Sequence, residues 1–213
     1  ATDGDDDVTT KSVVIGNQIS FEDDGPSITV TASVAADALV VDETVLGTDA
    51  TASFADNFTS TPAPGADGQK SVTSAYTLAI KAVDADTGLI DVATGEAVLL
   101  RMNGVTVEGY SATGGVVFTV DVDATTGLVE LDQVRALKHP DANDPGDAVT
   151  LTSADLISLT RTDTITDNDD DTSTDSGSID IGTALSFEDD GPDNYHPTAG
   201  LLENDGSDTI TES

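Results

Sequence analysis

Two stretches of this 213-residue chain place aspartates at every second position, TDGDDD at 2–7 and TDNDDD at 166–171. A tight loop can direct such alternating carboxylates at one ion, and Ca²⁺ takes roughly six to eight oxygen ligands. An EF-hand loop would also need a glycine and a glutamate where Thr172 and Ser178 stand. The alternative is a solvated acidic linker. We predict calcium loops of another type, with the ligands Asp3, Asp5, Asp7, Asp167, Asp169 and Asp171.

The heptapeptide SFEDDGP occurs at residues 20–26 and again at 186–192, and we call it the seam motif. In each copy a phenylalanine ends an apolar stretch, three acids follow, and Gly-Pro imposes a turn. Adjacent like charges disfavour the ionised state unless a cation binds them. Alternatively, the charges protect strand edges from aggregation. Calcium at both seams is the prediction, with ligands from a neighbouring loop and from Asp23, Asp24, Asp189 and Asp190.

A third acidic segment is HPDANDPGD at 139–147. Its oxygen-bearing side chains are further calcium candidates, namely Asp141, Asn143, Asp144 and Asp147. Weaker candidates are the acid pairs Asp42 with Glu43, Asp84 with Asp86, and Asp121 with Asp123. We expect several calcium ions and no other cofactor.

These acids must be positioned by strands, because the apolar residues alternate with period two. Val116, Phe118, Val120 and Val122 share one face of such a strand. Turns rich in Gly, Pro and Asp separate many short strands, which is typical of an antiparallel β-sandwich of Greek-key or immunoglobulin-like type. One helical turn is expected at 133–138. The predicted strands cover 27–34, 38–41, 76–82, 97–102, 105–110, 116–123, 128–131, 149–152 and 156–166.

The repeated seam indicates a tandem array, because the match extends backwards to Gly16 with Gly182 and Ile15 with Ile181. We expect residues 1–26 to be the last strand and seam of a preceding repeat, 27–192 one complete repeat, and 193–213 the start of the next module. Both copies should bury their apolar faces alike. These faces are Val13, Ile15, Ile19 and Phe21 in the first copy and Ile179, Ile181, Leu185 and Phe187 in the second.

Composition disfavours several function classes. With 41 acidic and 7 basic residues the formal net charge is −34, which opposes nucleic-acid binding. No stretch is apolar enough to predict membrane insertion. His139 and His196 each precede a proline, neither G-x-S-x-G nor H-x-x-x-H occurs, and no Trp offers a sugar-stacking face. We therefore predict a protein that is not an enzyme.

The order of SFEDDGPSITV, VVDETVL, GADG, TGLID, KHPDANDP, TDNDDD and a second SFEDDGP resembles the repeats of giant type I-secreted RTX adhesins of Gram-negative bacteria. The glycine-rich RTX repeat itself, G-G-x-G-x-D, is absent. The resemblance implies an extracellular, calcium-bound extender module that spaces a ligand-binding tip from the cell. Its partners would be neighbouring repeats, and we expect a monomer. Alternatives are a calcium-dependent carbohydrate- or peptide-binding module of the same adhesin, or a generic surface scaffold repeat.

Overall fold

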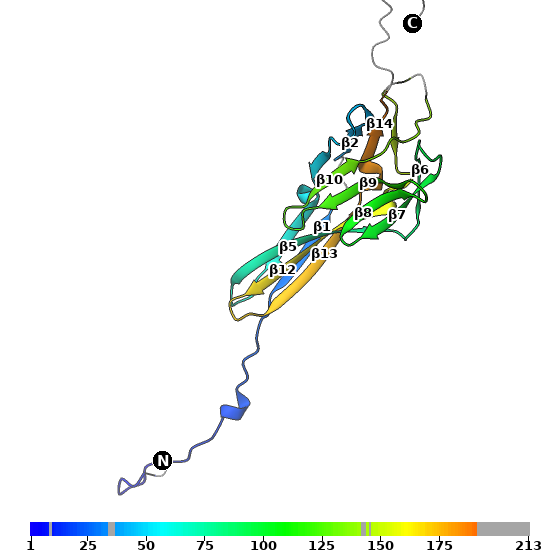
Figure 1. Cartoon of the computed structure of the whole chain (residues 1–213). Helices are drawn as coiled ribbons and strands as arrows, with labels where there is room; N and C mark the ends of the chain where they lie inside the picture. The colour runs from blue at the N-terminus through cyan, green and yellow to red at the C-terminus, as the bar shows by residue number, and fades with distance from the viewer. Residues whose placement is uncertain (9, 34–36, 142–143, 145, 191–213) are drawn as a thin grey trace, which may run out of the picture.

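A computed structural model of the chain describes residues 1–8, 10–33, 37–141, 144 and 146–190. Within these residues the structure is all-β, with 14 strands and five single 3-10 turns. The strands form an elongated body, and residues 1–26 leave it at the end where β5, β12 and β13 meet, while β14 ends toward the opposite end (Figure 1). Among the described residues no helix is long and apolar enough to cross a membrane. The predicted β-sandwich is confirmed.

One layer of the sandwich is a six-stranded antiparallel sheet in the order β3-β10-β9-β8-β7-β6. The register of β8 on β9 shifts between Gly109 and Tyr110, so Val117 and Phe118 are both buried although they are consecutive. A Cβ on Gly109 would lie 2.1 Å from the Phe118 ring, so only glycine fits there. The strands are β3 (Ala50–Ser53), β6 (Asp86–Ile90), β7 (Ala97–Asn103), β8 (Thr106–Ser111), β9 (Gly115–Val122) and β10 (Leu128–Gln133).

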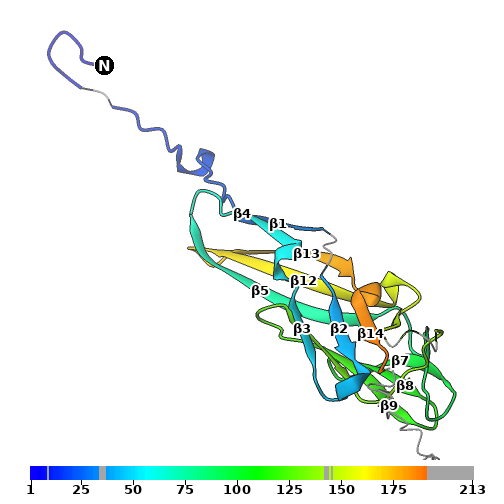
Figure 2. The ribbon, with the colours of Figure 1, turned by 90° about the horizontal axis from the view of Figure 1, so that it is seen from above.

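The facing layer consists of two three-stranded sheets, β13-β12-β5 and β11-β14-β2 (Figure 2). The antiparallel pair β1-β4 packs beside β13. The Phe118 and Phe187 rings meet across the layers with centroids 5.2 Å apart. The pair β2-β14 is parallel, unlike the rest of the sandwich. The strands are β1 (Ser27–Ala32), β2 (Leu39–Asp42), β4 (Phe58–Ala63), β5 (Gln69–Ile80), β11 (Ala148–Thr150), β12 (Ile157–Asp167), β13 (Thr172–Asp180) and β14 (Leu185–Glu188).

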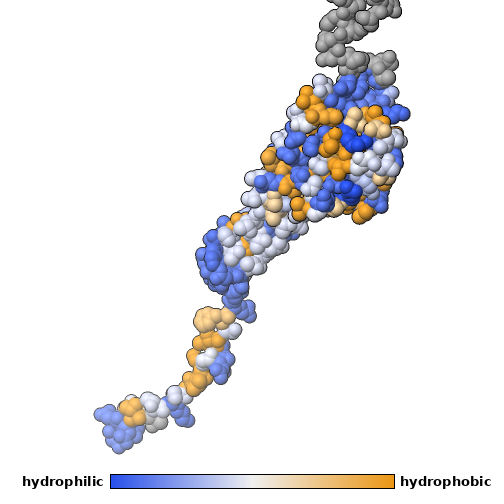
Figure 3. Space-filling model, viewed as in Figure 1, coloured by the Kyte–Doolittle hydropathy of each residue, from blue (hydrophilic) through white to orange (hydrophobic). Residues whose placement is uncertain are grey.

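The two copies of the apolar seam stretch are not packed alike, so that prediction was wrong. Phe187 is fully buried in β14, whereas Phe21 is 94% exposed. Val13, Ile15 and Ile19 are exposed as well, and Figure 3 shows apolar colour along the segment that precedes the body. The reason is that β14, which contains the second copy, already occupies the position between β2 and β11 in the sheet. The first copy therefore cannot pair at that position in this body.

The helical turn expected at 133–138 is also absent, because tertiary contacts draw this segment across the sheet end. Leu137 forms an isolated bridge with Asp91, and the Arg135 guanidinium pairs with the Asp91 carboxylate at 2.9 Å. The backbone N–H of Leu137 donates to Glu43 Oε1 at 2.7 Å. These partners satisfy the backbone and side chains in an extended conformation.

Candidate metal centres at the two ends of the module

The predicted loop Asp167–Asp171 is the turn between β12 and β13, at the end of the body where residues 1–26 enter. The turn is closed by Asp167 N–H donating to Asp171 O (3.1 Å) and Asp171 N–H donating to Asp167 Oδ1 (2.9 Å). Asp170 adopts a left-handed φ of 79°. Asn168 joins this turn to the β4–β5 loop, because its Nδ2 donates to Asp67 O at 2.7 Å. Two acidic loops therefore lie side by side.

Five carboxylates converge at this end, and we call Asp23, Asp67, Asp167, Asp169 and Asp171 the N-terminal acid cluster. Oxygen atoms of Asp23, Asp169 and Asp171 lie within 4.8 Å of one another, and so do those of Asp67, Asp167 and Asp169. Asp169 belongs to both groups. Asp167 is fully buried, and its Oδ2 has no hydrogen-bond partner among the described residues. A buried carboxylate oxygen without a partner is costly unless a cation binds it.

The electrostatics of the cluster reflect this crowding. The pKa of Asp67 is raised, first by the charge of Asp169. Burial raises the pKa of Asp167, and the neighbouring carboxylate of Asp169 adds to it. The pKa of Asp171 is raised by hydrogen bonding with Asp23 and by the nearby negative charges. The cluster is thus a set of like charges that disfavours its own ionisation, which is the condition that a bound divalent cation relieves.

The seam residues fit closely against the module loops. A Cβ on Gly65 would lie only 2.3 Å from the carbonyl oxygen of Asp24, and Gly65 has a φ of +69°. A Cβ on Gly25 would lie 3.9 Å from Asp171 Oδ2. The structure brings the seam acid Asp23 together with Asp169 and Asp171 of the neighbouring loop. Asp24 contributes its backbone to the contact with the β4–β5 loop.

Asp3, Asp5 and Asp7 form an exposed loop with the same local geometry as Asp167–Asp171. Their carboxylate oxygens lie within 4.8 Å of one another. Asp3 N–H donates to Asp7 O (3.1 Å), Asp7 N–H donates to Asp3 Oδ1 (3.2 Å), and Asp6 has a φ of 67°. A hydrogen bond from Asp5 holds the pKa of Asp3 below its ordinary value. The sequence repeat is thus also a repeat of turn geometry.

In the HPDANDPGD loop, the carboxylates of Asp144 and Asp147 accept hydrogen bonds from backbone N–H groups of the same loop. Asp144 Oδ1 accepts from Gly146 N–H at 3.1 Å, and Asp147 Oδ2 accepts from Asp141 N–H at 2.9 Å. The candidate Asn143 lies outside the described residues. Among the described residues, Asp141, Asp144, Asp147 and the exposed Asp190 belong to no group of three convergent ligands. These four predicted ligands are not brought together.

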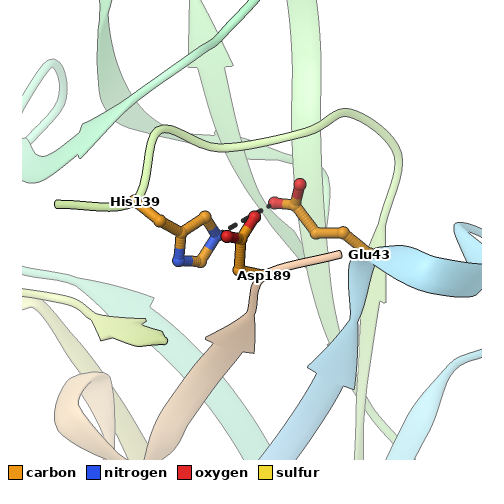
Figure 4. A group of neighbouring side chains, drawn as sticks. All are labelled: Glu43, His139 and Asp189. Atoms are coloured by element: carbon orange, nitrogen blue, oxygen red, sulfur yellow. Dashed lines mark hydrogen bonds and ion pairs between the residues drawn. The ribbon is translucent and has the colours of Figure 1, made fainter. Parts of the chain in front are cut away.

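Asp189 instead converges with Glu43, which is one of the weaker calcium candidates, and with His139, which was not predicted to be a ligand. Glu43 follows β2, Asp189 follows β14, and His139 lies in the segment after β10; we call these three the exit triad (Figure 4). Their ligand atoms lie within 4.8 Å of one another. In the sequence, Glu43 stands out only as half of the acid pair with Asp42, and His139 only as a histidine that precedes a proline. The parallel pairing of β2 with β14, which the sequence does not reveal, brings them together.

The chain belongs to the family described as a domain of unknown function, DUF5801, whose match covers residues 38–182. No curated protein and no solved structure matches the chain. The family match includes the strands and loops that carry Asp67, Asp167, Asp169, Asp171, Glu43 and His139.

Proposed function

We propose that the chain is a calcium-stabilised extender module of a bacterial surface adhesin, exported by type I secretion and repeated in tandem. One observation carries the proposal: Asp23, from the seam that precedes the module, lies within 4.8 Å of Asp169 and Asp171 of the module itself. An ion bound there fastens the incoming linker to the body. A module whose linker is fixed keeps a constant orientation relative to its neighbour in the array. A rigid spacer requires this.

The exposed first copy of the seam stretch supports the tandem arrangement. Phe21 and its apolar neighbours match the buried second copy in apolar pattern and in local turn, since a 3-10 turn forms at Gly16–Gln18 as it does at Gly182–Ala184. Large apolar side chains in such a row indicate a surface that another body covers. A preceding repeat with its own β2 and β11 offers a matching slot.

Calcium suits the cluster because all the converging side chains are carboxylates. Extracellular modules bind Ca²⁺ with dissociation constants on the order of 10⁻⁴ to 10⁻³ M. At about 1 mM Ca²⁺ one such site contributes roughly 0.4 to 1.4 kcal/mol to folding. Several sites together approach a sizeable part of a domain's stability of about 5 to 15 kcal/mol. The array would then be loose where calcium is scarce and stiff outside the cell.

Small-angle X-ray scattering of a two-repeat chain, with residues 27–192 written twice, tests this proposal. We expect the maximum dimension to be larger and better defined in Ca²⁺ than in EGTA. Asp169→Asn should remove the difference, because Asp169 belongs to both groups of the cluster. Asp170→Asn is the matched control, since Asp170 pairs with Lys70 and lies outside both groups. Scattering that does not respond to Ca²⁺ would contradict the proposal.

A further inference from the structure

The exit triad contains an imidazole, which sets its chemistry apart from the all-oxygen N-terminal acid cluster. We propose that Glu43, His139 and Asp189 bind a divalent transition-metal ion, for which Zn²⁺ is the reference, and that this ion fastens the chain where it leaves the module. The inference goes beyond the extender function and does not depend on calcium at the other end.

The three side chains are directed at one point by the fold. In the parallel ladder Glu188 lies beside Asp42, so Glu43 and Asp189 leave neighbouring strands at the same end. His139 approaches from the segment after β10, and its ring faces both carboxylates (Figure 4). The His139 and Glu43 side chains are only 3% and 5% exposed. A site enclosed in this way is pre-organised and largely shielded from water.

Glu43 is held in place as a ligand by groups that do not neutralise it. Its Oε1 accepts from Gln133 Nε2 at 2.7 Å and from Leu137 N–H at 2.7 Å, and it lies 3.3 Å from His139 Nε2. Hydrogen bonds of this type fix the orientation of the carboxylate, as the second layer around a metal site does.

The charge balance of the triad calls for a cation. Among the described residues, neither Glu43 nor Asp189 forms an ion pair with a lysine or arginine, and the Asp189 carboxylate accepts no hydrogen bond. His139 Nδ1 is buried and also has no partner in the described part of the chain. A metal ion on Nε2 supplies two positive charges at the point where both carboxylates converge.

The donor set selects the class of metal. One imidazole nitrogen with two carboxylate oxygens matches Zn²⁺ and neighbouring transition metals, whereas Ca²⁺ prefers oxygen ligands alone. The bound ion would join β2, β14 and the 139 segment at the end where β14 leaves the body.

Isothermal titration calorimetry of the full chain with ZnCl₂, in excess Ca²⁺, tests the proposal. We expect one Zn²⁺ per chain, with affinity reduced more than about 100-fold in His139→Gln and in Asp189→Asn. His196→Gln replaces the other histidine of the chain and should bind as the wild type does. His139→Gln keeps a donor for Glu43, and circular dichroism verifies its fold. Should that variant not fold, the half-buried Asp189→Asn decides.

A second readout is the visible spectrum of the Co²⁺-loaded chain. Intense d–d bands that disappear in His139→Gln would support imidazole ligation. No Zn²⁺ binding in the presence of Ca²⁺, or binding that His139→Gln leaves intact, would overturn the proposal. Neither result would change the expected effect of Ca²⁺ on the scattering of the two-repeat chain. The zinc proposal and the extender proposal can therefore be refuted independently.

Discussion

At the scale of single residues, two fully buried aspartates of the module, Asp91 and Asp167, differ in how they are satisfied. Asp91 is fully buried but saturated, with Thr94, Ser111 and Arg135 as partners. Burial alone would raise its pKa, yet these hydrogen bonds outweigh burial and hold the pKa at about 2. Asp167 is equally buried but has an oxygen without a partner and a raised pKa. Asp91 is held by its hydrogen bonds and ion pair, whereas one oxygen of Asp167 is left for the ion that we propose.

Asp91→Asn should therefore lower the free energy of unfolding by about 2 kcal/mol at neutral pH, which is the scale of its pKa shift. Because the folded-state pKa is below the ordinary 3.8, this stabilisation is present above pH 3.8 and lost as the pH falls through about 2. Urea unfolding of the wild type and of Asp91→Asn at a series of pH values measures how this stabilisation changes with pH. Asp155→Asn, in an exposed pair with Lys81, should cost under roughly 1 kcal/mol. Equal losses in both variants would contradict this distinction.

At the scale of elements, local sequence encodes the turns, whereas burial depends on the neighbouring strands. TDGDDD and TDNDDD close with the same hydrogen bonds although only the second adjoins a β-sheet. Likewise the residue before each seam 3-10 turn, Ile15 or Ile181, has nearly the same backbone angles. Ile181 is buried and Ile15 is exposed. Turn geometry is therefore preserved without a core.

Gly65→Ala probes the contact between the β4–β5 loop and the seam. Gly95→Ala is the matched control, because Gly95 has a similar φ of +70° but no atom within 4 Å of its would-be Cβ. Both variants should lose about 1 to 2 kcal/mol from the left-handed backbone. Gly65→Ala should in addition displace Asp24 and weaken calcium binding. Thermal unfolding with and without Ca²⁺ measures both effects, and identical calcium responses would refute the contact.

The sequence predicted most strands and missed four, for physical reasons. In β13 (Thr172–Asp180) only Ile179 is buried, and most of the other residues are Ser, Thr and Asp. The strand therefore shows no alternation of apolar and polar residues. β4 contains Pro62, which argues against a strand, and β3 has only small residues. β6 contains only two large apolar residues, Leu89 and Ile90, and they are adjacent, so no alternation is visible in its sequence. Strand prediction succeeded where one face is apolar.

The candidate sites were predictable only in part. Spacing identified Asp167, Asp169 and Asp171, and the repeat identified Asp23, because both signals are local. Asp67 was not among the predicted ligands because it stands in GADG without an acidic neighbour. The exit triad depends on the parallel β2-β14 pair and on a segment almost a hundred positions away from Glu43, so no local pattern indicates it.

At the scale of the whole molecule, the chain enters the body of the module at one end and β14 ends toward the opposite end (Figure 1). One proposed ion site lies at each of these ends. The seam motif divides into two functional parts in this arrangement. In the second copy Phe187 is buried in the core of the body, and in the first copy Asp23 lies beside the acidic loop that carries Asp169 and Asp171.

Identical substitutions in the two seam copies test this division. Phe187→Ala should lower the free energy of unfolding by about 3 to 5 kcal/mol, because the side chain is fully buried against Phe118. Phe21→Ala should leave the stability of this chain unchanged, since Phe21 contacts no core here. Chemical denaturation measures both. A loss in Phe21→Ala as large as that in Phe187→Ala would show that the first copy packs on the body.

The most direct measurement is a calorimetric calcium titration of the metal-free chain and of Asp169→Asn and Asp170→Asn. The account predicts saturable Ca²⁺ binding by the wild type and by Asp170→Asn, with dissociation constants on the order of 10⁻³ M or tighter. Asp169→Asn should lose the ions of the N-terminal acid cluster. Absent binding by the wild type, or equal binding by all three proteins, would contradict the claim that these carboxylates converge in order to hold calcium.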